Sequence, residues 1–290
     1  MRLEDQRPSD NVEDRRGAGG GRGFALGGRG GLGVGAIVVA LIAMFMGVDP
    51  RLVLGLMGDG GPVMQAPAPQ TAPGSAPADP MGRFVARVMG STEDTWQALF
   101  AQQGAQYREP RLVLYQGGTR TACGYGSATA GPFYCPPDST VYLDTSFFDQ
   151  LAARFRAPGD FAQAYVIAHE VGHHVQNMMG VMDRMQHLRP QLSPAQNNAL
   201  SVRVELQADC FAGVWAHHAQ RRGQIEVGDV DEALRAAAAI GDDTLQRSSQ
   251  GRVVPESFTH GTAEQRSRWF RTGMAAGTLA ACNTFDAKTL

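Results

Sequence analysis

Two histidines and a glutamate occur together in the pentapeptide His169-Glu170-Val171-Gly172-His173, which fits the pattern H-E-x-x-H. In a helix, residues four positions apart lie one turn apart on the same face, so both imidazoles can reach one metal ion. Glu170 directly follows the first histidine and is close enough to take a proton from a water bound to that metal. The pentapeptide therefore predicts a zinc site with His169 and His173 as ligands and Glu170 as the general base.

A catalytic zinc ion takes three protein ligands and keeps a fourth position for water, so the pentapeptide needs one further ligand. The strongest candidate is Glu205, in the sequence VELQADCFAGVW on the next long predicted helix. Asp209 follows one helical turn later, where its carboxylate could accept the distal N–H of a liganding imidazole. A solvated acidic helix face is the alternative interpretation of these two acids. The alternative third ligands are His174, His187, His217 and His218.

These residues must be positioned by two helices and a small sheet. Apolar residues at helical spacing predict a motif helix from Asp160 to about Gly180, and a long helix from Ser193-Pro194 to about Gln220. Residues 111–115 and 140–144 have the composition and alternation of strands. Other helices are expected at residues 83–103, with a break at 90–92, and at 147–155, 229–249 and 262–281. The predicted fold class is therefore α+β, mainly helical, with the sheet before the motif helix.

The amino-terminal third is predicted to lie outside the globular domain. Residues 1–30 are rich in Gly and Arg and are expected to be disordered. Residues 31–48 contain no charge over 18 residues, which approaches the roughly 20 residues of a single transmembrane helix. A buried core helix is the alternative for this run. Residues 49–80 are rich in Pro and Ala and read as a linker, which leaves residues 81–290 as the zinc-binding domain.

Arginines precede the apolar run, and this asymmetry predicts that the amino-terminal side stays in the cytoplasm. The protein would then be a single-pass protein of the bacterial inner membrane. It would contact the lipid bilayer through residues 31–48 and place residues 81–290 on the periplasmic or extracytoplasmic side. The formal net charge of −2 gives no indication of a nucleic-acid partner.

Four cysteines lie in the predicted exported domain, and an even number there indicates two disulfides. Four cysteines allow three pairings. We favour Cys123–Cys135, which closes a local loop, and Cys210–Cys282, which ties down the last helix. Four buried thiols are the alternative.

Several stretches of residues 119–282 resemble the neutral zinc metallopeptidase family of bacteria. These stretches are CGYGSATAGPFYCPPDSTVYLD, FAQAYVIAHEVGHHVQNMMG, VELQADCFAGVW and ESFTHGTAEQRSRWF, and NVEDRRG at residues 11–17 resembles the start of that family. The resemblance implies a membrane-anchored, zincin-like domain of the gluzincin type. It also implies that one Zn²⁺ is bound by His169, His173 and Glu205, with Asp209 supporting a ligand. Related membrane peptidases have a His-Pro followed by an Arg, and His260 and Arg266 have this spacing with Gly261 in place of Pro.

These observations predict a zinc metalloendopeptidase that acts on a peptide or protein substrate. Zinc-bound water would attack the peptide carbonyl with Glu170 as base, and His260 or Tyr142 would donate a hydrogen bond to the oxyanion. A helix-capping residue is the alternative for His260. Strand 140–144 is either an edge on which a peptide docks or a plain core strand. The alternative function is a non-catalytic, zinc-binding envelope scaffold or partner-binding protein.

Overall fold

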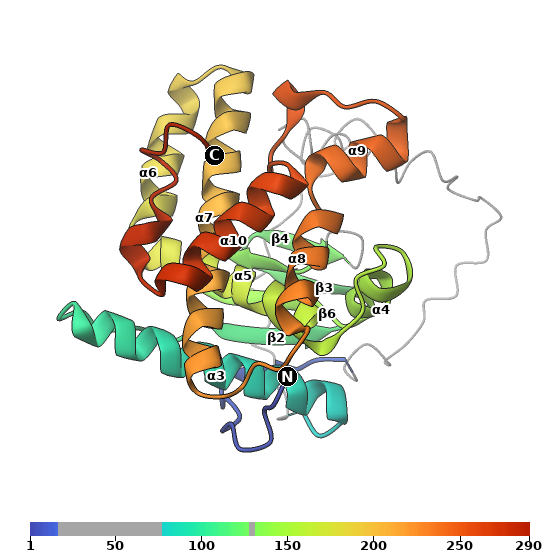
Figure 1. The fold of residues 1–290 in the computed structure, drawn as a ribbon, viewed down its shortest axis with the longest axis vertical. Helices are drawn as coiled ribbons and strands as arrows, with labels where there is room; N and C mark the ends of the chain where they lie inside the picture. The colour runs from blue at the N-terminus through green and yellow to red at the C-terminus, as the bar shows by residue number, and fades with distance from the viewer. Residues whose placement is uncertain (17–76, 128–130) are drawn as a thin grey trace, which may run out of the picture.

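The computed structural model describes residues 1–16, 77–127 and 131–290, and its architecture is mainly helical with a small sheet (Figure 1). This agrees with the predicted α+β class. The α-helices are α3 (Pro80–Gln102), α4 (Ser146–Ala153), α5 (Asp160–Met178), α6 (Val181–Leu188), α7 (Pro194–Arg221), α8 (Asp229–Ala239), α9 (Asp242–Gln250) and α10 (Ala263–Ala276). Short 3₁₀ turns are η2 (Pro136–Asp138), η3 (Arg189–Gln191), η4 (Pro255–Ser257) and η5 (Leu279–Cys282).

Four short strands form the main sheet in the order β1-β2-β6-β5. They are β1 (Val12–Asp14), β2 (Arg111–Tyr115), β6 (Thr140–Asp144) and β5 (Phe133–Cys135). Strand β2 is parallel to both β1 and β6, whereas β5 is antiparallel to β6. The strands predicted at residues 111–115 and 140–144 are confirmed. Of the two alternatives for residues 140–144, the core strand is confirmed and the peptide-docking edge is wrong, because β6 is paired on both sides.

The sheet separates two groups of buried side chains, because successive residues of a strand point to opposite faces. One face packs into the main core together with α3, α5 and α7, and it carries Leu112, Leu114, Val141 and Leu143. The other face holds a smaller cluster made of Val113, Tyr115, Cys135 and Tyr142. Helix α5, with the H-E-x-x-H residues, therefore lies on the main-core side of the sheet.

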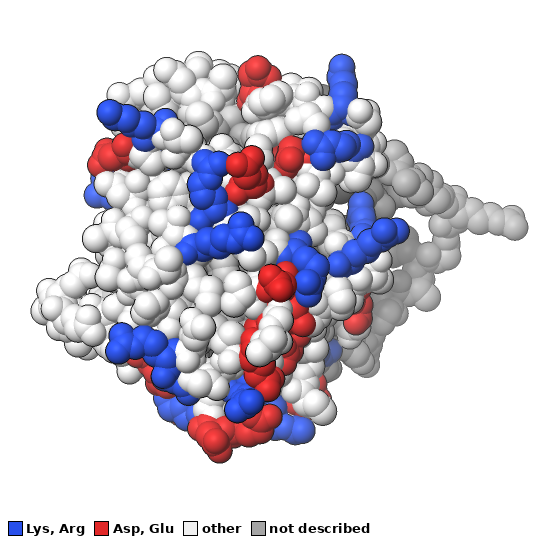
Figure 2. All heavy atoms as spheres, viewed as in Figure 1, with Lys and Arg blue, Asp and Glu red and all other residues white. Residues whose placement is uncertain are grey.

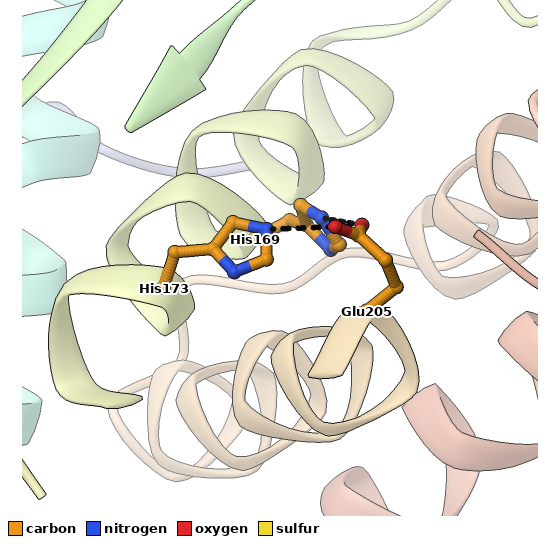
Figure 3. A group of neighbouring side chains, drawn as sticks. All are labelled: His169, His173 and Glu205. Carbon is orange, nitrogen blue, oxygen red and sulfur yellow. Dashed lines mark hydrogen bonds and ion pairs between the residues drawn. The ribbon is translucent and has the colours of Figure 1, made fainter. Parts of the chain in front are cut away.

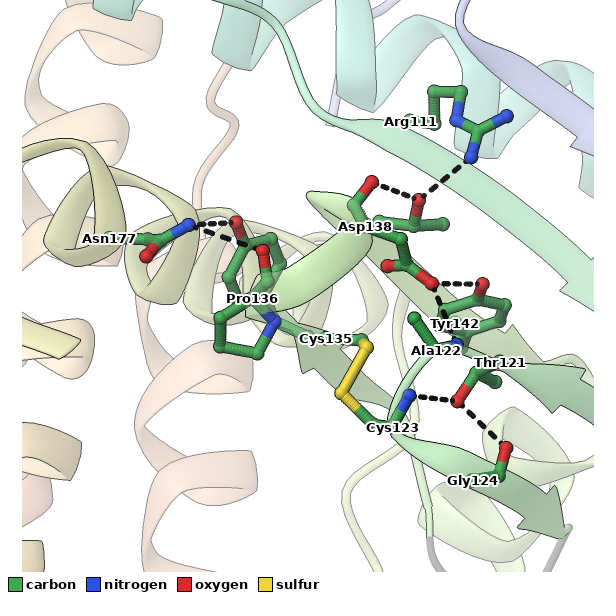
Figure 4. Close-up of a disulfide and its surroundings, with 12 residues drawn as sticks. Arg111, Thr121, Ala122, Cys123, Gly124, Cys135, Pro136, Asp138, Tyr142 and Asn177 are labelled. Carbon is green, nitrogen blue, oxygen red and sulfur yellow. Dashed lines mark hydrogen bonds between the residues drawn. A yellow bond between two sulfur atoms is a disulfide. The ribbon is translucent and has the colours of Figure 1, made fainter. Parts of the chain in front are cut away.

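Both predicted disulfides are confirmed. Cys123–Cys135 joins β5 to an antiparallel hairpin of β3 (Gly118–Thr121) and β4 (Gly124–Ser127) (Figure 4). This hairpin lies in a Gly-rich stretch between the two predicted strands, where no strand was predicted from the sequence. Cys210–Cys282 joins α7 to η5 near the carboxyl end of the domain. The second cross-link fixes the last segment of the chain against the helix that carries Glu205 and Asp209.

Two helices differ from their predicted extents. Helix α3 continues through residues 90–92, where a break was expected, because Ser91 accepts a hydrogen bond from the indole of Trp215 and donates one to Gln224. These tertiary contacts satisfy a side chain that would otherwise favour a helix end. The helix predicted at residues 229–249 is two helices, α8 and α9, which are separated at Gly241.

Residues 1–16, which we call the amino-terminal strap, are part of the folded domain. The predicted disorder is therefore wrong for this stretch, because Leu3 and Val12 are buried in the main core and β1 belongs to the sheet. Residues 17–30, the predicted span 31–48 and most of the predicted linker lie outside the described residues. Among the residues that are described, none of the helices combines the length and the apolarity needed to cross a membrane.

The surface carries charges of both signs. In the view of Figure 2, arginines and acidic side chains are interspersed over the face formed by α8 and α10. Some of them pair within one helix, as Arg268 does with Glu264 at 2.7 Å on α10. Charges on this face are therefore partly compensated locally, in keeping with the formal net charge of −2.

Candidate metal centre

Helices α5 and α7 cross at Gly172, inside the H-E-x-x-H sequence. A Cβ atom at this position would lie 3.0 Å from the carbonyl oxygen and 3.2 Å from the Cα atom of Ala208. Only glycine therefore allows the two backbones to approach this closely without displacement. Because Gly172 lies between the two histidines of the pentapeptide and Ala208 lies between Glu205 and Asp209, the crossing brings the side chains of both helices together.

Three candidate ligands converge at this crossing (Figure 3). The Nε2 atom of His169 lies 3.2 Å from Oε2 of Glu205, and Nε2 of His173 lies 3.6 Å from Oε1 of the same carboxylate. One ligand atom from each of the three residues lies within 4.8 Å of the others. The structure thus brings together the ligand set that the sequence predicts.

The other nitrogen of each imidazole is held by a protein oxygen. Nδ1 of His169 lies 2.8 Å from Oδ1 of Asp209, and Nδ1 of His173 lies 2.8 Å from Oε1 of Gln176. When Nδ1 carries the proton and donates a hydrogen bond to the neighbouring oxygen, Nε2 of each ring is unprotonated and presents its lone pair toward Glu205. Asp209 therefore has the position predicted from sequence, and Gln176 is a second orienting group that the sequence did not reveal.

Asp209 is fully buried and is surrounded by donors. It accepts hydrogen bonds from Tyr165 Oη at 2.5 Å, from Arg266 Nε at 2.9 Å and from Arg266 Nη2 at 2.9 Å. Burial alone would raise the pKa of Asp209, but the charges of Arg266 and His169 outweigh this effect and lower it. A carboxylate held ionised in this way can fix the ring of His169. Arg266, suggested by the family resemblance, acts here through Asp209.

The charges in this cluster also shift the candidate ligands. Burial alone would lower the pKa of His169, yet the neighbouring Asp209 and Glu205 carboxylates raise it to about 10. Burial would raise the pKa of Glu205, yet His173 and His169 hold it well below its usual range. Metal binding at this site must displace a proton from the histidines, so metal affinity should depend on pH.

Glu170 lies beside the cluster without belonging to its hydrogen-bond network. The residue is 8% exposed, and the contacts that join the cluster run between the histidines and Glu205 and do not include the Glu170 carboxylate. A buried carboxylate next to a metal-binding cluster can accept a proton from a water molecule held there. The position of Glu170 is therefore compatible with the predicted role of general base.

His260 lies at the rim of the cluster, in the loop before α10. Its Nδ1 atom is 3.2 Å from Oδ1 of Asp242, whose other oxygen accepts the backbone N–H groups of Thr259, His260 and Gly261 at 2.7, 2.6 and 3.1 Å. Burial would lower the pKa of His260, but Asp242 and Glu205 raise it. Because the charge of Glu205 contributes to this shift, His260 lies in the neighbourhood of the candidate metal ligands.

Gly261 explains a departure from the related membrane peptidases. Its φ angle is +91°, whereas the ring of proline fixes φ near −65°. The proline found after the corresponding histidine in those peptidases cannot adopt this conformation. Thr262, and not His260, is the N-cap of α10, so the helix-capping alternative for His260 is wrong.

The remaining sequence candidates lie elsewhere. The two nitrogens of His174 contact Tyr134 Oη and the Arg108 carbonyl, at 3.0 and 2.6 Å. His187 is exposed on α6, and His217 and His218 bind backbone carbonyls at the end of α10. Tyr142 is not an oxyanion donor, because it lies on the opposite face of the sheet from α5 and donates to Asp138 at 2.8 Å (Figure 4).

Besides Gln176, sequence reasoning missed two further site residues, Tyr165 and Asp242. Tyr165 precedes His169 by one helical turn, a spacing that could have indicated that both side chains reach the same carboxylate. Asp242 comes from α9, and only the tertiary structure places it against the loop before α10. Its sequence context, in a run expected to be one continuous helix, carries no such signal.

The fold and the donor set define the class of protein as an α+β metal-binding domain of the H-E-x-x-H type, with a glutamate from a second helix as third donor. The chain belongs to the family described as "putative neutral zinc metallopeptidase", which matches residues 1–285. The family resemblance of the sequence is thereby confirmed, and zinc is the metal that the family implies.

Two groups of relatives are similar over most of their length. The chain is 51% identical to the uncharacterized protein YpfJ of Escherichia coli (strain K12) over 291 residues, covering 98% of this chain and 99% of the relative. It is 41% identical to the uncharacterized protein Rv2575 of Mycobacterium tuberculosis (strain ATCC 25618 / H37Rv) over 269 residues, covering 86% of each. No solved structure matches this chain.

Proposed function

We propose that this protein is a zinc metalloendopeptidase that hydrolyses peptide bonds in a peptide or protein substrate. The observation that carries the proposal is the convergence of His169, His173 and Glu205 beside the buried carboxylate of Glu170. Three donors leave one position for water, which is the arrangement of catalytic zinc sites and not of closed structural sites. Membership in a zinc metallopeptidase family supports the same assignment.

The residues present suit zinc. Two imidazoles and one carboxylate form a donor set of the kind found in catalytic zinc sites. Each imidazole has its second nitrogen fixed by an oxygen, from Asp209 for His169 and from Gln176 for His173. Orienting contacts of this type hold ligands ready for a metal ion and raise metal affinity. A bound Zn²⁺ would make water acidic at neutral pH and polarise the carbonyl of the scissile bond.

The chain's own residues supply the proton transfers. Glu170 is the group that accepts the proton of the attacking water and later delivers it to the leaving amine. At 8% exposure, Glu170 is largely shielded from bulk water. A carboxylate in such surroundings is better placed to exchange protons with the reacting groups than with solvent.

His260 is proposed to donate a hydrogen bond to the oxyanion that develops on the substrate carbonyl. Its raised pKa favours a protonated ring that carries positive charge in the neighbourhood of Glu205. Asp242 is proposed as a positioning residue, because its carboxylate binds His260 Nδ1 and three successive backbone amides. Preorganised donors of this kind stabilise developing negative charge without reorganisation during the reaction.

We also propose that the domain works outside the bacterial cytoplasm. The two disulfides, Cys123–Cys135 and Cys210–Cys282, support this location, since such bonds persist in oxidising compartments and are rare in the cytosol. Association with the inner membrane remains a prediction that depends on residues 31–48, which lie outside the described residues.

Metal content and peptide cleavage test the proposal together. The purified full chain should bind one equivalent of Zn²⁺ and cleave members of a peptide library. Glu170→Gln should keep the fold and the zinc but lose cleavage. A matched control is Glu264→Gln, which removes an acid that is 80% exposed on α10 and should keep full activity.

The alternative, a zinc-binding scaffold, makes a different prediction. A wild-type protein that is saturated with zinc and cleaves no peptide or protein would favour the scaffold. Glu205→Ala separates the ligand assignment from the activity, because it should lose stoichiometric zinc. Unchanged zinc content in that variant would refute Glu205 as a ligand.

A further inference from the structure

The amino-terminal strap is bound to the domain along its whole length. At its start, Arg2 Nε lies 3.0 Å from Oε1 of Glu226, just before α8. In its middle, the Ser9 backbone N–H donates to the Ala86 carbonyl of α3 at 2.8 Å. These contacts attach the strap to α3 and to the segment just before α8, which are far apart in the sequence.

The end of the strap continues the sheet. Strand β1 pairs with β2 in parallel, with Val12 opposite Leu112 and Asp14 opposite Leu114. The Leu112 N–H donates to the Asn11 carbonyl at 2.9 Å, and the Arg15 N–H donates to the Leu114 carbonyl at 2.8 Å. Without the strap, the outer edge of β2 would present unpaired backbone groups, which folded proteins normally cover.

A buried charge of the domain depends on the strap. Glu93 on α3 is 0% exposed, and its carboxylate accepts hydrogen bonds from Ser9 Oγ at 2.5 Å and from Asn11 Nδ2 at 2.9 Å. Arg7 lies 2.9 Å from its other oxygen. Burying a carboxylate without partners costs several kcal/mol. The carboxylate of Glu93 is therefore stable at this buried position only when the strap supplies its partners.

The last residue of the strap contacts the first residues of the remaining domain. The Arg16 guanidinium forms an ion pair with Asp14 and donates to Oδ1 of Asp79 at 3.3 Å. Asp79 is the N-cap of α3, where it accepts the N–H groups of Met81 and Gly82. The last residue of the strap and the N-cap of α3 thus lie beside each other, although they are 63 positions apart in the sequence.

We propose that the strap and residues 77–290 occupy the same compartment. The hydrocarbon core of a membrane is about 30 Å thick, whereas Arg16 and Asp79 lie within hydrogen-bonding distance. Two segments on opposite sides of a membrane could not make these contacts. The topology predicted from sequence, with residues 1–30 in the cytoplasm and residues 81–290 outside, therefore conflicts with the fold. If the disulfide-bonded domain is exported, the strap is exported with it.

Cysteine accessibility in intact cells tests this proposal with the full chain. Asp5→Cys in the strap and Gln102→Cys at the end of α3 each add one exposed thiol to a protein whose other cysteines are in disulfides. Bacterial cells that express either variant are treated with a membrane-impermeant maleimide, before and after permeabilisation. A cytoplasmic protein with a surface cysteine serves as the control for an intact membrane.

Equal behaviour of the two variants is the expected result. Both thiols should be labelled to the same extent in intact cells, or both only after permeabilisation. Labelling of Gln102→Cys in intact cells, with Asp5→Cys protected until permeabilisation, would overturn the proposal.

A cross-link provides the second measurement. Glu13 and Val113 are direct partners across β1 and β2, so the double variant Glu13→Cys, Val113→Cys should form a disulfide. The offset pair Asp10→Cys, Val113→Cys should not. Absence of the Glu13–Val113 cross-link in protein that still binds zinc would show that the strap is not seated in cells, and it would equally overturn the proposal.

Discussion

Replacing Asp209 with asparagine tests the central electrostatic feature of the metal centre. The carboxylate is 0% exposed and contacts His169, Tyr165 and Arg266. Asp209→Asn keeps the size and one oxygen acceptor but removes the negative charge. The substitution therefore changes two quantities, the stability of the zinc-free fold and the affinity for zinc, through different partners of the same side chain.

The stability effect comes from Arg266. Its guanidinium is 2% exposed and makes two hydrogen bonds of 2.9 Å to Asp209. Without the carboxylate, this cation is buried and lacks its counter-charge, which costs about 3–5 kcal/mol. The total stability of a domain is about 5–15 kcal/mol. We therefore expect a large drop in the thermal stability of the zinc-free variant.

The zinc effect comes from His169. Loss of a group that orients a liganding histidine typically weakens metal binding by about 10–100-fold. The asparagine oxygen can still accept from His169 Nδ1, so we expect a change near the lower end, about tenfold. Zinc affinity is measured by competition with a chromophoric chelator, and stability by thermal unfolding of the zinc-free protein.

A double variant separates the two effects. Asp209→Asn with Arg266→Met removes both buried charges, and replacing a buried ion pair by uncharged residues is often neutral for stability. The double variant should regain most of the lost stability while its zinc affinity stays low. Wild-type zinc affinity in Asp209→Asn would refute the orienting role of Asp209. No recovery of stability in the double variant would refute the argument from the buried charge.

Two further substitutions test the helix crossing and the rim histidine. Gly172→Ala should weaken zinc binding, because the added Cβ would lie 3.0 Å from the Ala208 carbonyl oxygen and the two helices would have to separate. The overpacking should cost about 1–3 kcal/mol of stability, and the higher helix propensity of alanine should return about 1 kcal/mol of it. A competition titration with a chelator measures the zinc affinity of the variant, and an affinity equal to that of wild type would contradict the close approach of α5 and α7. In the folded protein the pKa of His260 is raised above its ordinary value of 6.5. The charge pair between His260 and Asp242 therefore stabilises the fold fully at pH values below 6.5, and this stabilisation is lost as the pH rises through the pKa of the folded state. The difference in melting temperature between wild type and His260→Gln should therefore be larger at pH of about 5.5 than at about 9, and a difference that does not vary with pH would argue against the pair.

The sequence was sufficient where the determining interactions are local. The spacing of His169 and His173 follows from the period of one helix, and the Asp209 position follows from Glu205 in the same way. The extents of α5 and α7 were predicted within a few residues, because their apolar stripes and the capping box at Ser193 are local signals. The strands at residues 111–115 and 140–144 were equally readable from composition and alternation.

Contacts between distant segments could not be predicted from the sequence. The roles of Asp242 and of Ser91 depend on which segment packs against them. Asp242 was therefore predicted to lie inside one continuous helix, and Ser91 was predicted to lie in a helix break. Strand β6 looked equally suited to an edge or to the core, and only its pairing with β2 and β5 decided between them. The amino-terminal strap is the clearest case, since its composition indicated disorder while Glu93 and β2 supply the partners that order it.

The sequence by itself determined the chemistry of this protein: two histidines and a glutamate at helical spacing, a further acid pair on another helix, and four cysteines that can pair. Residue type and periodicity fix these features, because they depend on only a few neighbouring positions. The tertiary structure alone decided how the chemistry is assembled. It set the α5–α7 crossing at Gly172, the burial of Asp209 against Arg266, and the return of residues 1–16 to the sheet. These features depend on packing between segments as many as 100 residues apart, which no local pattern encodes.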